Sequence, residues 1–242
     1  MRLLRACFQH ASNSLNYCRQ AVKRPTGGNC RQDVGIRRNA AGLAGSVLLG
    51  MLSVGAAEAS SMITGPSTLG PPAAVRFCQQ SPRECSPRGP NLRAVPLTPT
   101  RWQELQDVNN AVNASVAERS DAEVFGQEDV WSLPVNGQGD CEDFALLKRR
   151  QLIERGWPSS ALLVTVVTTW SGEGHAVLTV VTDQGDFVLD NRTSSVRPWS
   201  STGYRFFTRQ AQGNPRRWVW IEPGAGRAPV TAASGPASKA SR

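Results

Sequence analysis

The sequence predicts a globular domain in which helices precede a set of β-strands. From Pro99 to Arg119, apolar residues recur at three- and four-residue steps, the periodicity of a helix with one buried face. Beyond residue 158, apolar and β-branched runs bounded by Gly or Pro are typical of buried strands. A chain of 242 residues, 40% of them hydrophobic, is large enough to bury a core.

The net charge of +8 is concentrated at the amino terminus. Residues 1–59 hold eight Lys and Arg against two acidic residues, so six of the eight net positive charges lie there. A basic amino-terminal segment is typical of a targeting signal rather than of a binding patch. We therefore expect no nucleic-acid partner.

The same segment has the pattern of an export signal. Arg37 and Arg38 precede an uncharged, partly apolar stretch that ends in Ala57-Glu58-Ala59, a small-x-small pattern suited to signal peptidase. This stretch is rich in Gly and Ala and short of the ~20 strongly apolar residues of a membrane span. The sequence thus predicts a leader, residues 1–59, that is cleaved before Ser60 and leaves no stable membrane anchor.

Removal of the leader leaves three of the six cysteines. In an oxidising compartment, Cys78 and Cys85 can close a small loop through a disulfide. Cys141 is then the odd thiol, which marks it as a reactive candidate. The spacing supplies no fourth soft ligand, so a zinc site is not expected.

Three segments follow the leader. We expect residues 60–98, rich in Pro, Ser and Gly, to form an extended arm pinned by the Cys78–Cys85 bridge. Residues 99–222 form the domain, and its first helix covers the core. Residues 223–242 are rich in Gly, Ala, Ser and Pro and are expected to be a disordered tail.

A second helix is expected from Cys141 to about Arg155. Asp140 is a favoured N-cap residue, and Asp143 stands three positions later, where a capping partner would lie. Gly156 supplies the stop. Cys141 then occupies the first helical position, where free N–H groups and the helix dipole favour the thiolate. The alternative is a small buried cysteine on an amphipathic helix.

Four strands are expected after this helix. The first, 161–169, is apolar throughout and buried on both faces. The next two, 175–181 and 186–190, are joined by a turn at 182–185, and 218–221 forms the last.

His175 is the only histidine beyond the leader. With a turn at 182–185, Val177 faces Asp190, and His175 and Asp190 become diagonal neighbours, roughly 7–8 Å apart by backbone. A slip by one residue would separate them onto opposite faces. A lone histidine is often structural, and an acid at a strand end often caps it. Together with the thiol, however, they supply a nucleophile, a base and an orienting group.

Three motifs stand out: Gly139-Asp140-Cys141-Glu142-Asp143-Phe144-Ala145, Gly174-His175-Ala176-Val177 and Leu189-Asp190-Asn191. They resemble the bacterial transglutaminase-like cysteine peptidases, which include the LapG-type periplasmic proteases that release biofilm adhesins. The segment from Phe77 to Cys85 looks like the amino-terminal element of that family. The resemblance covers about residues 75–222.

The resemblance implies an α+β fold of the papain-like or transglutaminase-like type, with the nucleophile at a helix amino terminus packed on an antiparallel sheet. It implies Cys141 as nucleophile, His175 as general base and acid, and Asp190 as orienting group, in acyl transfer through a thioester. The backbone N–H of Cys141 would be an oxyanion donor. This chemistry requires no cofactor.

The resemblance also implies calcium at Asp140 and Glu142, with Asp143 as an addition, because hard oxygen ligands suit calcium. The competing interpretation is that these acids only cap the helix and complement its dipole.

The resulting hypothesis is an exported, periplasmic cysteine peptidase that cleaves a periplasmic or surface protein, with a surface adhesin as the implied substrate. Two alternatives remain open. One is a transglutaminase or amidase with the same triad, and the other is a non-catalytic periplasmic module that binds protein or calcium.

Overall fold

Seven strands form one antiparallel sheet within residues 60–223, the part of the chain that this computed structural model describes. The leader with its cleavage site, and the tail from residue 224, lie outside the described residues. The strands follow the order β1-β9-β8-β4-β5-β6-β7. Their bounds are β1 (Thr64–Thr68), β4 (Leu162–Thr168), β5 (Gly174–Thr182), β6 (Gly185–Leu189), β7 (Arg197–Pro198), β8 (Arg205–Ala211) and β9 (Asn214–Ile221).

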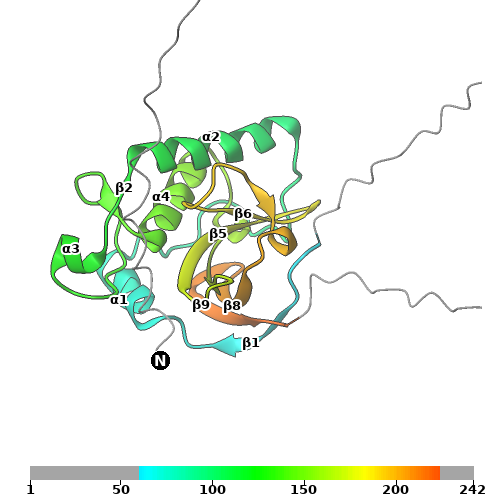
Figure 1. Ribbon diagram of the computed structural model, residues 1–242. Helices are drawn as coiled ribbons and strands as arrows, with labels where there is room; N and C mark the ends of the chain where they lie inside the picture. Colours follow the sequence, from blue (N-terminus) through cyan, green and yellow to red (C-terminus); the bar gives the residue numbers. More distant parts are fainter. Residues whose placement is uncertain (1–59, 224–242) are drawn as a thin grey trace, which may run out of the picture. The chain divides into compact units, whose positions relative to one another are not determined.

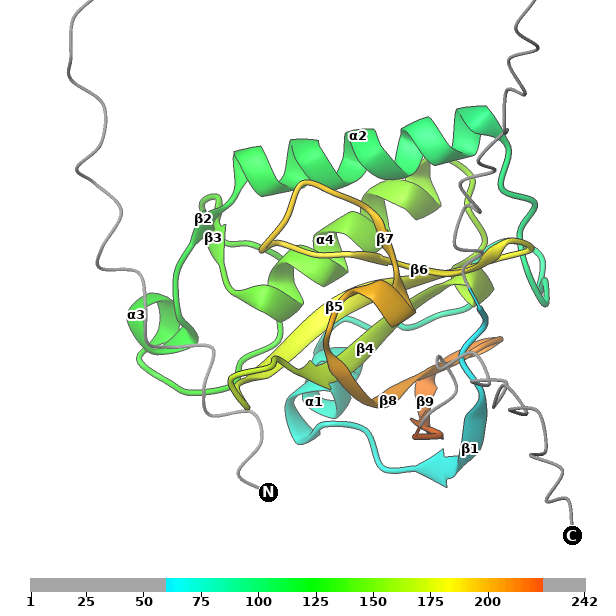
Figure 2. The same ribbon diagram turned by 45° about the vertical axis from the view of Figure 1, so that its right-hand side comes forward.

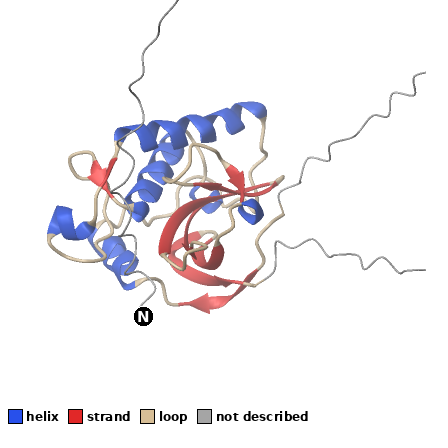
Figure 3. Cartoon of the chain, viewed as in Figure 1, coloured by secondary structure: helices blue, strands red, loops and turns tan. Residues whose placement is uncertain are grey.

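The helix that begins at the candidate nucleophile is central to the fold. Helix α4 (Cys141–Glu154) packs between α2 (Pro99–Ser115) and strands β4 and β5 (Figures 1 and 2). Figure 3 shows α2 and α4 on the same side of the curved sheet. The remaining elements are α1 (Pro72–Gln80), α3 (Asp121–Phe125), the short strands β2 (Ala117–Glu118) and β3 (Gln138–Gly139), and two 3-10 turns, Ser159–Ala161 and Trp199–Ser201. No helix of the described part is long and apolar enough to cross a membrane.

The β5–β6 hairpin has the register that the sequence predicts. Thr182 pairs with Gly185, and Leu178 pairs with Leu189. Because strand side chains alternate between faces, this register keeps the residues at 175 and 190 on one face. All seven residues of β4 are buried, as expected for a central strand.

The sheet buries apolar side chains on both faces. One face carries Val166 and Leu178 into the core shared with the helices. The other carries Val167 and Val177 into a smaller cluster that includes Trp199. Continuous apolar runs in β4 and β5 are explained by this two-sided burial.

Helix α2 is shorter than the sequence predicts. It ends at Ser115 rather than near Arg119, because the following residues pair with the segment that leads to α4. The Ala117 N–H donates to the Gly137 carbonyl at 2.7 Å, and the Arg119 N–H donates to the Gly139 carbonyl at 2.9 Å. These bonds satisfy backbone groups outside the helix and fix the approach to the candidate nucleophile.

Residues 60–98 are more regular than an extended arm. They contain β1, which pairs with β9, and α1, whose Ala73, Ala74 and Phe77 enter the core. The helix is only nine residues long and starts at Pro72, so its apolar positions are too few to give a clear period. The predicted Cys78–Cys85 disulfide is present and joins the end of α1 to the next loop.

Strand β8 was not expected from the sequence. Its residues, Arg205–Ala211, show neither alternation of polar and apolar side chains nor a long apolar run, yet they pair with both β4 and β9. The long partner strands, rather than local preference, determine its conformation.

Candidate active site

A tight turn presents Cys141 at the start of α4. Asn136 and Gly137 have φ values of 52° and 71°, and they reverse the chain directly before β3. A Cβ atom on Gly139 would lie 2.5 Å from a carboxylate oxygen of Asp143, so only glycine fits there. The predicted helix start is therefore confirmed, and close packing of the turn on α4 fixes it.

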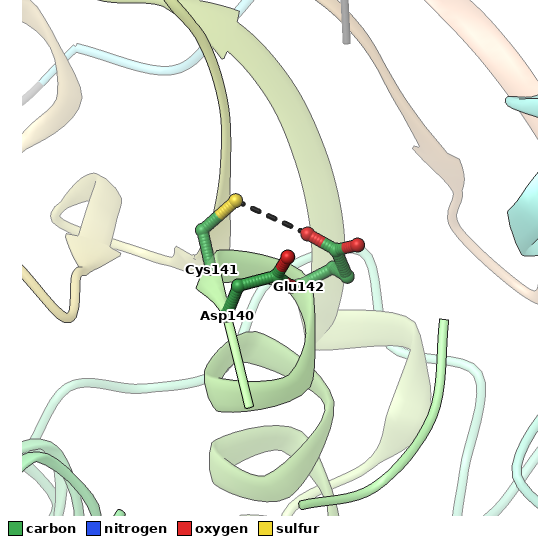
Figure 4. A group of neighbouring side chains, drawn as sticks. All are labelled: Asp140, Cys141 and Glu142. Atoms are coloured by element: carbon green, nitrogen blue, oxygen red, sulfur yellow. Dashed lines mark hydrogen bonds between the residues drawn. The ribbon is translucent and has the colours of Figure 1, made fainter. Parts of the chain in front are cut away.

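Cys141 is the first residue of α4 and is buried. Asp140 occupies the N-cap position, but its side chain makes no capping hydrogen bond. The Cys141 thiol donates to Glu142 Oε2 at 3.1 Å, and Figure 4 shows the two groups facing each other. This hydrogen bond stabilises the thiol, whereas the helix amino terminus stabilises the thiolate. Within residues 60–223, Cys141 is the free cysteine.

His175 and Asp190 are in direct contact. His175 Nε2 lies 2.9 Å from Asp190 Oδ1, and both side chains are buried. The Arg192 N–H also donates to Oδ1, at 3.1 Å. Burial alone would raise the pKa of Asp190, but hydrogen bonds and the charge of His175 outweigh burial and lower the pKa to about 2. Asp190 is thus an ionised carboxylate aimed at an imidazole.

Helix α2 holds the loop that carries Asp190. Asn113 donates to the Asp190 carbonyl at 2.9 Å and to the Thr193 carbonyl at 3.1 Å. One turn earlier, Asn109 donates to the carbonyls of Thr193 and Ser194. The helix that the sequence assigned only to core packing therefore also positions the candidate orienting group.

Tyr204 is a site residue that sequence reasoning missed. Its hydroxyl donates to Asp190 Oδ2 at 2.6 Å. Its ring meets the His175 ring edge-on, with centroids 5.6 Å apart. It precedes β8, which the sequence did not reveal.

Three buried carboxylates lie together beside the nucleophile. Ligand atoms of Asp121, Asp140 and Asp143 are all within 4.8 Å of one another. Burial raises the pKa of Asp143 to about 8, and the negative charges of Asp140 and Asp121 act in the same direction. Asp121 begins α3 and was not predicted as a site residue. A second group, Asp140, Cys141 and Glu142, meets the same distance criterion.

Lys148 is a buried cation on α4. Its side chain is 1% exposed, and its Nζ has no hydrogen-bond partner among the described residues. The ammonium lies 5.8 Å from the centre of the Phe144 ring. Burial lowers the pKa of Lys148 to about 7, although the negative charge of Asp190 acts in the opposite direction.

We expect Lys148→Met to stabilise the protein. An unfolded lysine has a pKa of about 10.4, so burial of the amine in its protonated form costs on the order of 4–5 kcal/mol below pH ~7. This cost falls as the pH rises from ~7 and vanishes above ~10.4, where the lysine is neutral in both states. Denaturant unfolding at pH ~6, ~8 and ~10 measures the gain, with Leu147→Met as the control. A loss of stability at pH ~6 would contradict this assignment.

Residues 64–225 match the family model of the bacterial transglutaminase-like cysteine proteinases. The chain belongs to this family. The protein is therefore a cysteine peptidase by family, with the α+β, papain-like fold that the sequence resemblance implied. The match includes β1 and α1 as well as the sheet, so most of the segment expected to be an arm lies within the matched residues.

Solved structures of Legionella pneumophila LapG are similar to the chain. One is 27% identical, covers 50% of this chain and 68% of LapG, and has a TM-score of 0.42. A calcium-bound LapG structure is 23% identical, covers 57% and 77%, and has a TM-score of 0.44. An EGTA-treated one is 25% identical, covers 50% and 67%, and has a TM-score of 0.43. Comparison with curated protein sequences gives no match.

Proposed function

We propose that this protein is an exported peptidase in which Cys141 is the nucleophile, His175 the general base and acid, and Asp190 the orienting group. The buried contact of 2.9 Å between His175 Nε2 and Asp190 Oδ1 carries the proposal. A carboxylate on one ring nitrogen fixes the imidazole and stabilises its protonated form, as in other triads. The Nδ1 atom is then the ring nitrogen that exchanges protons with the thiol.

One feature supports an approach of Cys141 to this pair. Cys141 and Lys148 are seven residues apart and so share one face of α4. Lys148 experiences the charge of Asp190, which indicates that this face points toward the His175–Asp190 pair.

The proposed reaction is peptide hydrolysis in two steps. In the first, the Cys141 thiolate attacks the carbonyl carbon, and His175 Nδ1 protonates the departing amine as the C–N bond breaks. The backbone N–H of Cys141 donates to the developing oxyanion. In the second, His175 takes a proton from water, which attacks the thioester carbonyl. The acid product leaves, and the thiolate and imidazolium return.

We propose a periplasmic location for the mature chain. The export signal in the sequence supports this, and so does the Cys78–Cys85 disulfide, because such bonds persist in oxidising compartments. The proposed substrate is a periplasmic or surface protein, with a surface adhesin implied by the family resemblance.

We propose calcium as an accessory ion. Asp121 Oδ1 and Asp143 Oδ2 are buried without hydrogen-bond partners among the described residues, and ligand atoms of both residues lie within 4.8 Å of one another and of Asp140. Oxygen-only ligands and three clustered carboxylates suit a hard divalent cation. Asp121, Asp140 and Asp143 would hold it, and Glu142 is the neighbouring carboxylate. Bound calcium would supply positive charge beside the nucleophile. LapG has been observed in a calcium-bound form.

We expect calcium to stabilise the wild-type protein against heat. A ligand at a hundred times its Kd adds about 2.7 kcal/mol to the unfolding free energy, which raises the Tm by several degrees. Asp121→Asn should lose most of this gain, whereas Asp107→Asn, on the exposed side of α2, should retain it. Calorimetry in calcium and in EGTA measures the difference. An equal gain in the wild type and in Asp121→Asn would remove this cluster as the calcium site.

One experiment separates the proposed peptidase from its alternatives. The purified protein is incubated with periplasmic and surface proteins of the bacterium that encodes it, in the presence of a biotinylated primary amine. A peptidase creates new protein amino termini that are absent with Cys141→Ser. A transglutaminase instead incorporates the amine. If neither product forms although the protein is folded, the remaining function is the non-catalytic binding module.

A further inference from the structure

The two oxygens of the Asp190 carboxylate have separate tasks. Oδ1 faces His175 Nε2 at 2.9 Å and accepts from the Arg192 N–H at 3.1 Å. Oδ2 accepts from the Tyr204 hydroxyl at 2.6 Å. The last side-chain torsion of aspartate is broad, so a carboxylate held at one oxygen alone can rotate. Donors on both oxygens fix its plane.

Tyr204 is suited to hold this carboxylate. Its backbone N–H donates to Thr202 Oγ1 at 3.2 Å, which ties its position to the turn after Trp199. Its ring also packs edge-on against His175, so it contacts both members of the pair. Burial and the neighbouring charge of Asp190 raise the pKa of the phenol, so it stays a donor throughout the neutral range.

We infer that Tyr204 is a positioning residue of the active site, whose hydroxyl holds Asp190 in the orientation that keeps His175 fixed. This inference deepens the proposed function, because it assigns the residue that aligns the orienting group. Tyr204 acts through Asp190 and His175. A hydrogen bond from a neutral donor to an ionised acceptor is stronger than one between neutral groups, and burial strengthens it further.

Tyr204 also lines a cavity of about 670 Å³ together with Trp220. Trp220 is half-exposed and lies on β9, where it pairs with Thr208 of β8. Trp220→Phe is therefore a matched aromatic control. It changes the wall of the same cavity and leaves the hydroxyl of Tyr204 in place.

The test is the lifetime of the His175 Nε2 proton, followed by NMR in ¹⁵N-histidine-labelled full chain. The chain has two histidines, so His10→Asn in the background leaves one imidazole signal. We expect Tyr204→Phe to exchange this proton with water about tenfold faster than wild type, the order expected for loss of a hydrogen bond to a charged group. Trp220→Phe should leave the rate unchanged.

A variant with a stronger hydrogen-bond donor at position 204 separates loss of the hydrogen bond from a folding defect. Replacing the two tyrosines with 3-fluorotyrosine makes the phenol a stronger donor at nearly unchanged shape, and we expect slower exchange than in wild type. Equal exchange rates across Phe, Tyr and fluorotyrosine would overturn the role of Tyr204. Because this readout does not involve Cys141, it remains valid if the proposed peptidase mechanism fails.

Discussion

Asp190→Asn is expected to slow alkylation of Cys141 by iodoacetamide about tenfold to a hundredfold at pH ~6. The loss follows because an amide has no charge with which to stabilise a protonated imidazole, and without imidazolium the thiolate is less stable. Above pH ~9, where an isolated thiol ionises by itself, the variant and the wild type should react at similar rates.

Asp183→Asn is the matched control for this prediction. Asp183 lies in the turn of the same hairpin, and its carboxylate accepts from the Leu97 N–H at 2.9 Å. Its loss should affect stability modestly and leave the pH dependence of alkylation unchanged. A wild-type profile in Asp190→Asn would mean that Asp190 only caps the end of β6.

Arg209→Met is expected to destabilise the fold by about 3–5 kcal/mol at pH ~7.5, because it leaves a buried carboxylate without its cation. Arg209 Nη1 lies 2.9 Å from Asp186 Oδ2, and both side chains are buried. Burial raises the pKa of Asp186, and the charge of Arg209 opposes this rise. Without Arg209 the pKa rises further, so the folded state binds a proton that the unfolded state releases. The variant should therefore recover stability as the pH falls toward ~5.

A double variant provides the control for the pair. Replacement of both partners by apolar residues, Asp186→Leu with Arg209→Met, removes both buried charges and should cost less than Arg209→Met alone. Urea unfolding of the four proteins gives the interaction energy. Additive effects of the two substitutions would show that the ion pair contributes nothing.

The hairpin that brings His175 to Asp190 could be predicted because it is local. The two residues are 15 positions apart, and one turn sets the register between them. Side-chain alternation then leaves a single choice of face once the turn is known. The helix start at Cys141 was predictable for the same reason, since the turn residues and the N-cap position are adjacent in sequence, although Asp140 makes no side-chain capping hydrogen bond.

The groups that support this pair could not be predicted, because they arrive from distant elements. Asn113 reaches the Asp190 carbonyl across 77 residues, and Tyr204 reaches its carboxylate from the loop before β8. The sequence did contain one sign that α2 makes polar contacts. Asn109 and Asn113 are four residues apart, and Asn109 lies among the buried residues of α2, where a polar side chain needs a partner.

The cluster of carboxylates beside Cys141 could also be predicted only in part. The sequence suggested Asp140 and Glu142 as calcium ligands, which is still a proposal. Asp121 joins a different group, with Asp140 and Asp143, and it comes from α3, whose start is fixed by a capping box between Ser120 and Glu123. That capping box was readable in the sequence, although its proximity to the turn before Cys141 was not.

The most direct test of the proposed mechanism is the alkylation rate of Cys141 against pH, in the wild type and in His175→Ala, with calcium and with EGTA. The account predicts rapid labelling of the wild type well below pH ~8.5, where an unperturbed thiol begins to ionise, and loss of this advantage in His175→Ala. Labelling of the wild type at the rate of an ordinary thiol, unaffected by His175→Ala, would contradict the account.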